Sequence, residues 1–166
     1  MRVRPFPVVL AVCAATEVEG HLVIEQRGSR VAQGAGMLHV KPSGHVHPPQ
    51  TPWQALLAET EEELGLLEGE IRDGEWIGLV RSLTAPCVVV TYRMRTTVNW
   101  SEMLSRHPVD AWEHDRLIAL PLDRQSLESW LLENRERATG PGHAAVLLEG
   151  GVRYGEEWFE GMQCQF

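Results

Sequence analysis

The pattern of apolar and polar residues along the chain predicts a mixture of strands and helices. Two apolar runs, residues 8–14 and 21–26, flank a turn that contains Gly20, which is typical of a β-hairpin. Further strands are expected at residues 37–40, 76–81, 88–95 and 117–120. A late hairpin is expected from residues 144–148 and 152–154, because Gly150 and Gly151 stand between them. Strands and helices in this order indicate an α/β or α+β sandwich.

The clearest helix is expected over residues 51–64. Thr51 can cap it, Gln54 completes a capping box, and Pro52 takes the first helical position. Gly65 stands where a helix commonly ends. The residues expected on the buried face recur at helical spacing: Trp53, Leu56, Leu57, Thr60 and Leu64. A second helix is expected over residues 126–137.

Charge and cysteine content narrow the classes of function. The formal net charge is −8, which argues against a surface for duplex nucleic acid or for anionic membranes. A small phosphorylated substrate remains compatible, since a bound metal ion reverses the local field. The three cysteines form no CxxC pair, so a disulfide scaffold or a zinc site is not expected. A reducing cytoplasm is the simpler location.

The first residues allow two interpretations. Arg2 and Arg4 precede the apolar residues 8–15, which loosely resembles a secretory signal. Pro5 and Pro7, the short apolar run and its continuation into a hairpin favour a folded strand instead. We therefore expect one domain over residues 1–166, with residues 140–166 as a C-terminal extension. No apolar stretch approaches the roughly 20 residues that a membrane span requires.

Three glutamates gather on one face of the expected helix. Glu59, Glu62 and Glu63 stand at i, i+3 and i+4, where like charges repel. They also lie near the helix C-terminus, where the helix dipole disfavours anions. A hard divalent cation such as Mg²⁺ or Mn²⁺ offsets both effects, because these ions prefer carboxylate oxygens. The alternative is an acidic helix face in water, which is common because Glu favours helices.

The residues before this helix add a motif. Residues 44–66 read GHVHPPQTPWQALLAETEEELGL. In the Nudix motif a Gly precedes a Glu, an Arg-Glu pair, a Glu-Glu pair and a final Gly with an aliphatic residue, at fixed spacing. The matching residues are Gly44, Glu59, Glu62, Glu63, Gly65 and Leu66. The chain thus resembles the Nudix hydrolase family over this segment.

Three positions depart from the motif. Gln50 stands for the first Glu, Ala58 for the Arg, and Thr60 for the aliphatic residue. In the family, that Glu and Arg form a salt bridge that braces the loop against the helix. Losing both partners together can be nearly neutral, whereas losing one would leave an unpaired charge.

The resemblance implies an α/β/α sandwich with a mixed sheet, in which the motif forms a loop, a helix and a second loop. It implies that Glu59, Glu62, Glu63 and the carbonyl of Ser43 bind Mg²⁺ or Mn²⁺. The expected activity is hydrolysis of a phosphoanhydride bond in a nucleoside diphosphate-linked or related small molecule, with Glu62 and Glu63 in catalytic roles. Many members add a later carboxylate, for which we choose Glu113.

Several choices beside the motif stay open. Asp110 and Asp115 are alternatives to Glu113, and an ordinary polar loop is another. Arg27 and Arg81 could contact phosphate through the guanidinium fork, as could His45, although surface charge pairing is the favoured interpretation of each arginine taken alone. His45 and His47 could instead bind zinc, but a third ligand is missing. A homodimer is compatible with the family resemblance.

Two rival functions remain. One is a catalytically inactive Nudix-like module that binds a ligand or a partner. The other is a Nudix-fold isomerase, which would need a cysteine near the metal, and Cys87 is the one candidate. Glu63→Gln is expected to leave folding intact but to reduce activity and metal affinity sharply.

Overall fold

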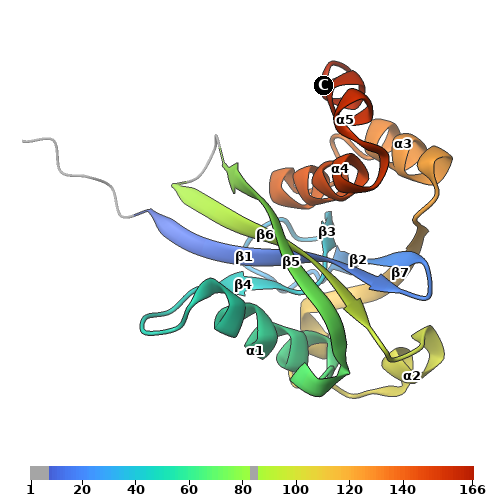
Figure 1. Ribbon diagram of the computed structural model, residues 1–166. Coiled ribbons are helices and arrows are strands. Elements are labelled where there is room, and N and C mark those ends of the chain that lie inside the picture. Colours follow the sequence, from blue (N-terminus) through green and yellow to red (C-terminus); the bar gives the residue numbers. More distant parts are fainter. Residues whose placement is uncertain (1–7, 83–85) are drawn as a thin grey trace, which may run out of the picture.

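The computed structural model describes residues 8–82 and 86–166. A mixed sheet lies between α1 (Pro52–Leu64) and α2 (Trp100–Ser105) on one face and three later helices on the other (Figure 1). The strands of this sheet are β1 (Val9–Val18), β2 (His21–Arg27), β3 (Leu38–Val40), β4 (Ser43–His45), β5 (Ile71–Arg81), β6 (Cys87–Thr96) and β7 (His114–Pro121). The later helices are α3 (Arg124–Glu133), α4 (Gly140–Tyr154) and α5 (Glu156–Gln163), and the short helices are η1 (Glu68–Glu70) and η2 (Ala111–Glu113). The expected sandwich with a mixed sheet is confirmed.

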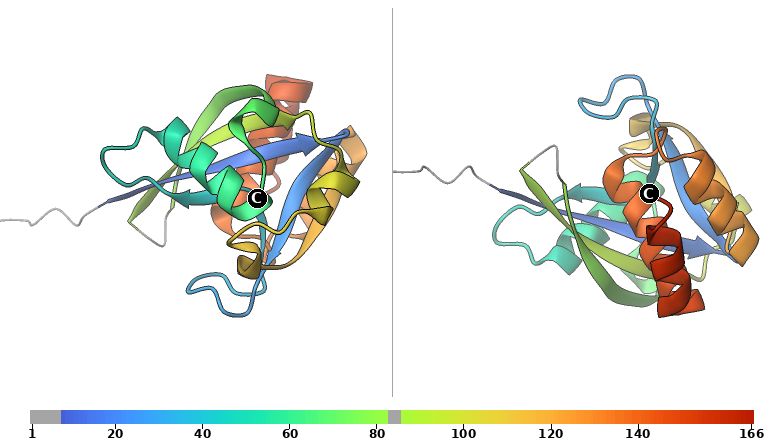
Figure 2. Two further views of the ribbon diagram at one scale, coloured as in Figure 1. Left: turned by 90° about the horizontal axis from the view of Figure 1, so that it is seen from below. Right: turned by 90° about the horizontal axis from the view of Figure 1, so that it is seen from above.

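Strand β1 organises the sheet. It pairs in parallel with β6 and antiparallel with β2 and β4, and the main strand order is β3-β2-β1-β6-β5. Strand β7 adds antiparallel to β2. Seen from below, α1 lies in front of the strands, whereas seen from above the C-terminal helices do (Figure 2). The signal-like residues 2–7 lie outside the described residues.

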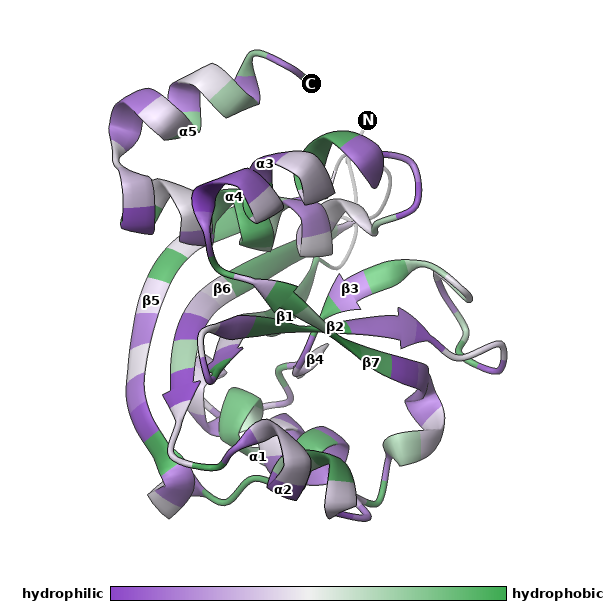
Figure 3. Cartoon of the chain, turned by 90° about the vertical axis from the view of Figure 1, so that its right-hand side faces the viewer, coloured by the Kyte–Doolittle hydropathy of each residue, from purple (hydrophilic) through white to green (hydrophobic). Residues whose placement is uncertain are grey.

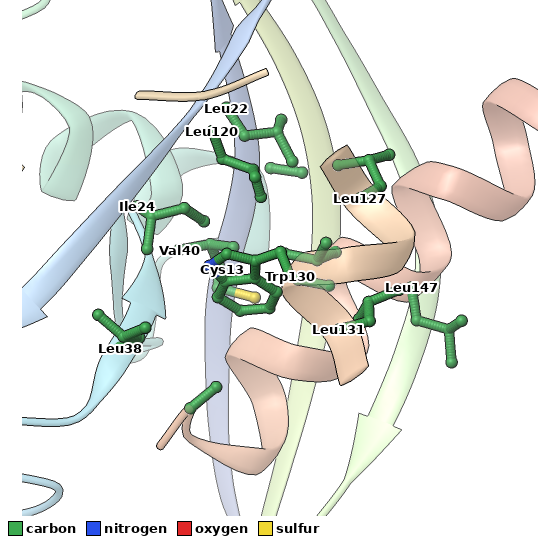
Figure 4. Packing of buried hydrophobic residues seen from close by; sticks show 14 of the residues in the cluster. Cys13, Leu22, Ile24, Leu38, Val40, Leu120, Leu127, Trp130, Leu131 and Leu147 are labelled. Atoms are coloured by element: carbon green, nitrogen blue, oxygen red, sulfur yellow. The ribbon is translucent and has the colours of Figure 1, made fainter. Parts of the chain in front are cut away.

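Alternation along β1 builds two cores. Cys13 and Ala15 face α3 and α4, whereas Val12 and Ala14 face α1, because successive strand side chains point to opposite faces. On the first face, Trp130 and Leu131 of α3 and Leu147 of α4 cover the strands (Figure 4). Cartoon ribbons coloured by hydropathy show green segments on the strands between the helical layers (Figure 3). Buried β1 therefore sits between two helical layers.

Helix α1 begins and ends where the sequence predicts. The Thr51 side chain accepts from the Gln54 N–H, the Gln54 side chain accepts from the Thr51 N–H, and Pro52 opens the helix. Gly65 ends it with φ 66°, a left-handed conformation that favours glycine. The buried face differs from the expectation, since Trp53 and Leu57 are half-buried and Glu63 is buried. This difference bears directly on the site.

The expected late hairpin is wrong. Residues 140–154 form α4, which Thr139 caps by accepting from the Gly142 N–H. Gly150 and Gly151 serve close packing rather than a turn: a Cβ at Gly150 would come within 2.1 Å of the Trp158 ring in α5. A glycine pair in a chain read alone does not distinguish a turn from a helix crossing.

The remaining boundaries differ from the pattern in smaller ways. Helix α3 ends at Glu133 rather than at residue 137, and β5 begins at Ile71 rather than at residue 76. The sequence pattern did not predict β4, α2 or α5. Among the described residues, the structure contains no helix with the length and apolar character to cross a membrane.

Buried His39 in β3 makes the folded state sensitive to acid. Burial, with the charges of Arg27 and Lys41, lowers the pKa of His39 to about 3. The unfolded chain has a histidine pKa near 6.5, so between these values only the unfolded state takes up the proton. Stability from neutral His39 is therefore present at pH 7 and is lost as the pH falls. We expect a loss of about 2 kcal/mol at pH 5.

Urea unfolding at pH 7 and pH 5 measures this loss. His39→Asn should remove that part of the difference, whereas His107→Gln, which changes an exposed histidine, should leave it unchanged. An equal pH dependence in wild type and His39→Asn would show that His39 is not the source.

Candidate functional site

Helix α1 presents its three glutamates with very different exposure. Glu59 is half-buried, Glu62 is exposed, and Glu63 is 1% exposed. Glu59 lies against Gly44 of β4, where a Cβ would come within 1.8 Å of Glu59 Oε1. Glycine at position 44 therefore makes room for the Glu59 carboxylate. The helix also holds the loop before η2, since the Asp110 N–H donates to the Glu62 carbonyl at 2.8 Å.

A buried lysine lies beside these carboxylates. Lys41 follows β3 and is fully buried. Its Nζ forms ion pairs with Glu63 Oε1 and, at 3.0 Å, with Glu25 Oε2. A longer pair of 3.7 Å reaches Glu113 Oε2 from η2. One ammonium thus links β2, α1 and η2.

Both oxygens of Glu63 have partners. Lys41 holds Oε1, and the backbone N–H of Ser43 donates to Oε2 at 2.8 Å. Glu25 is also paired twice, because Arg27 Nη1 donates to its Oε1 at 3.0 Å. The buried part of the site therefore balances Glu25 and Glu63 with Lys41 and Arg27. Buried charges are tolerated when they are paired in this way.

The outer carboxylates are not balanced in the same way. Within the described residues, neither Glu59 nor Glu62 forms an ion pair with a lysine, arginine or histidine. Burial, with the charges of Glu62 and Glu113, raises the pKa of Glu59 to about 7. Lys41 remains a cation, because the charges of Glu63 and Glu25 outweigh its burial and raise its pKa. Negative charge is therefore concentrated at Glu59 and Glu62, which have no cationic partner among the described residues, and at Glu113, which shares Lys41 with Glu63 and Glu25 at the longer distance of 3.7 Å.

This donor chemistry suits a divalent cation only in part. The carboxylate oxygens of Glu59, Glu62 and Glu113 are the kind of ligand that Mg²⁺ and Mn²⁺ prefer. In the described parts of the chain, however, no three His, Cys, Asp or Glu side chains converge closely enough to chelate an ion. Exposed Glu62 can reorient, whereas buried Glu63 is held by Lys41 and Ser43. Glu63 therefore does not fit the ligand set in this arrangement.

The structure brings some of the other candidates to this place. Glu113 is 30% exposed and lies beside Lys41, and the Gly28 N–H donates to its backbone carbonyl at 2.7 Å. Ser43 opens β4, next to Gly44. Arg27 adjoins the cluster through Glu25, and its Nε donates to the Gln33 carbonyl at 3.1 Å. These residues share one region, although their functional roles remain predictions.

Two predicted substrate-binding residues, Arg81 and His45, are not part of the carboxylate cluster. Arg81 is exposed on β5, and β1 and β6 lie between that strand and β4. His45 is exposed on β4, and its ring meets that of His47 edge-on with centroids 6.3 Å apart. Arg81 is therefore not brought to the carboxylates, whereas His45 stays near Gly44.

The isomerase alternative loses its proton donor. Cys87 packs against the core between the sheet and α3 and α4, whereas α1 covers the opposite face. Cys13 is buried in the same core, and Cys164 is exposed in the last residues of the chain. None of these three cysteines lies beside the glutamates of α1.

Sequence reasoning missed Lys41 and Glu25. The signal for Glu25 is its place in β2: it shares a strand face with Val23, at a position where alternation predicts burial. An acidic residue there requires a buried cation, and Lys41, at the end of the neighbouring strand β3, is close enough. This pairing joins distant parts of the chain, so sequence spacing alone does not reveal it.

Comparison with known proteins identifies the fold. A Nudix hydrolase from Nitrosomonas europaea matches with a TM-score of 0.66 and 17% identity, over 93% of this chain and 77% of that one. A MutT protein from Methanosarcina mazei Go1 matches with a TM-score of 0.61 and 19% identity, over 96% and 95%. A bifunctional NMN adenylyltransferase/ADP ribose pyrophosphatase from Francisella tularensis, complexed with AMP and a Mn ion, gives 0.62 and 16%, over 91% and 43%.

No family model matches the sequence, and none of the proteins with curated functions matches it. These three structural matches are each below 20% identity. The chain therefore has the fold of the Nudix hydrolases, as the motif at residues 44–66 predicted.

Proposed function

We propose that this chain is a hydrolase that cleaves a phosphoanhydride bond in a small, nucleotide-derived molecule with the help of Mg²⁺ or Mn²⁺. The observation that carries the proposal is a group of three carboxylates from α1 and η2. Among the described residues Glu59 and Glu62 have no cationic partner, and Glu113 pairs with Lys41 at the long distance of 3.7 Å. Repulsion among them disfavours this arrangement unless a cation joins it. The Nudix fold and the motif support the same activity.

The position of each candidate residue indicates its proposed role in metal or substrate binding. Glu59, seated against Gly44, and exposed Glu62 supply the oxygen ligands, with the Ser43 carbonyl as a further candidate. Glu113 faces them from η2 as the candidate base or additional ligand, and Asp110 and Asp115 are the alternatives. A bound divalent cation would polarise the phosphate oxygens and lower the pKa of a bound water. Arg27 and His45 flank this region and are the candidates for holding substrate phosphates.

The proposed class of substrate is taken from a structural neighbour. One structural neighbour is named an ADP ribose pyrophosphatase and was solved with AMP and a Mn ion. A nucleoside diphosphate derivative and a divalent cation are therefore the first compounds to test here. The three unpaired cysteines suit a reducing compartment such as the cytoplasm.

A hydrolysis screen tests the activity. Nucleoside diphosphate derivatives are incubated with Mg²⁺ or Mn²⁺, and release of AMP or inorganic phosphate is measured. Glu62→Gln should reduce turnover by about a hundredfold, since it removes one candidate ligand. Glu61→Gln is the matched control: it removes an equally exposed carboxylate on the same helix but on a different face. Equal turnover in the two variants would contradict the proposal.

The inactive binding module is the second candidate. The observation that favours it is the engagement of Glu63, whose two oxygens are held by Lys41 and Ser43. A module of this kind would bind a nucleotide derivative without cleaving it. Calorimetric binding without metal-dependent turnover, for any compound in the screen, would favour the module over the hydrolase.

A further inference from the structure

This chain lacks the contact by which the complete Nudix motif joins its loop to its helix. In families with the complete Nudix motif, a Glu and an Arg brace the loop against the helix, but here Gln50 and Ala58 occupy those positions. Gln50 is exposed, and among the described residues its side chain accepts a hydrogen bond only from the nearby His47 N–H, at 3.4 Å. Ala58 has no polar group to offer. The loop is therefore not joined to α1 through these two residues.

The Lys41–Glu63 pair makes an equivalent connection from the other side. Lys41 precedes the motif loop and Glu63 lies in the last turn of α1. The Ser43 N–H donates to the same carboxylate, so residues 41 and 43 both hold it. Glu25 adds a second carboxylate on Lys41 from β2. One fully buried ammonium thus joins β2 and α1 to the segment that leads into β4.

We infer that Lys41 is a built-in counter-ion for Glu63, and that Glu63 is a structural anchor of the loop rather than a metal ligand in this chain. The inference rests on the proposed function, because it concerns which carboxylates remain for a cation. Both Glu63 oxygens are occupied, and an Mn²⁺ ion there would have to approach a buried ammonium. Two cations at one carboxylate repel each other in a low-dielectric site.

This arrangement leaves a reduced ligand set. Glu59, Glu62 and Glu113 remain for an ion, and all three are at least partly accessible. The ion is therefore expected toward Glu59 and Glu62, neither of which pairs with a cation among the described residues. The stability of the loop then depends on the lysine and not on bound metal.

Crystals of the wild-type protein soaked in MnCl₂ test this location directly. We expect anomalous density in contact with Glu59 or Glu62, with Lys41 still paired to Glu63. Manganese bonded to a Glu63 oxygen, with the ammonium displaced, would overturn the inference and leave the proposed function standing. Crystals with no manganese at the cluster would overturn the proposed function, and the inference with it.

Manganese affinity in a double variant gives a second test. Lys41→Met/Glu63→Gln removes both buried charges and keeps an acceptor for the Ser43 N–H. If Glu63 is an anchor, Mn²⁺ binding by calorimetry should stay within about threefold of wild type, whereas Glu62→Gln should weaken it at least tenfold. A tenfold loss in the folded double variant would identify Glu63 as a ligand. Its melting curve checks that it folds, and the wild-type crystals provide the answer if it does not.

Discussion

Replacing Lys41 with Met should lower the free energy of unfolding by about 3–5 kcal/mol. The methionine fills a similar volume but removes the ammonium, so Glu63 and Glu25 lose their shared cation in a fully buried place. Glu25 keeps Arg27 at 3.0 Å, whereas Glu63 keeps only the Ser43 N–H. Burying a charge without a partner is among the few changes that destabilise a protein this strongly.

Urea unfolding at pH 7 measures the effect, with Arg124→Met as the matched control. Arg124 pairs with Glu128 at 2.8 Å on the surface, and such pairs contribute roughly 0–1 kcal/mol. Adding Glu63→Gln to Lys41→Met should restore part of the lost stability, because the unpaired carboxylate is then neutral. A loss below about 1 kcal/mol in Lys41→Met, similar to the control, would contradict the assigned role.

The same geometry revises the expectation for Glu63→Gln alone. The motif suggested that folding would stay intact, but the structure shows Glu63 buried and paired with Lys41. The substitution leaves the ammonium with Glu25 and the more distant Glu113. We therefore expect a loss of stability, smaller than that of Lys41→Met.

Replacing Gly44 with Ala should reduce metal affinity and turnover on the order of 10- to 100-fold while it changes stability little. The new Cβ would lie 1.8 Å from Glu59 Oε1 and 2.6 Å from Glu59 Cγ. A half-buried, flexible side chain can move aside, so the fold tolerates the change. The carboxylate, however, leaves the position beside Glu62 and Glu113 that the proposed function requires.

Gly69→Ala is the matched control for this prediction. Gly69 lies in η1, and a Cβ there would meet nothing within 4 Å. Mn²⁺ affinity and melting temperature are measured for both variants. If Gly44→Ala binds Mn²⁺ as tightly as Gly69→Ala, then metal binding does not depend on the contact between Glu59 and Gly44 of β4.

Local signals account for what the sequence predicted well. The cap at Thr51, the proline at position 52 and the left-handed Gly65 act within one or two turns, so they fixed the limits of α1 in advance. The two apolar runs and the turn at Gly20 are equally local, and they predicted β1 and β2. The sequence predicted Glu59 and Glu62 on α1 and Glu113 in the loop before β7. The structure brings these two segments to one region.

Contacts between distant segments account for what was missed. Gly150 and Gly151 look like a turn until Trp158 and Phe159 of α5 are placed over them. Lys41 and Glu63 are separated by 22 positions, and nothing in their spacing indicates a buried pair. Arg81 was a reasonable phosphate contact by residue type, but the strand order places it on the far strand β5. Each miss depends on packing that no single segment encodes.

Calorimetric titration of Mn²⁺ into the metal-free protein tests the central claim most directly. Wild type and Glu61→Gln should take up the ion with the same affinity, and Glu62→Gln should bind it at least about tenfold more weakly. Equal affinities in all three proteins, or no uptake by any of them, would contradict a cation site at the outer glutamates of α1.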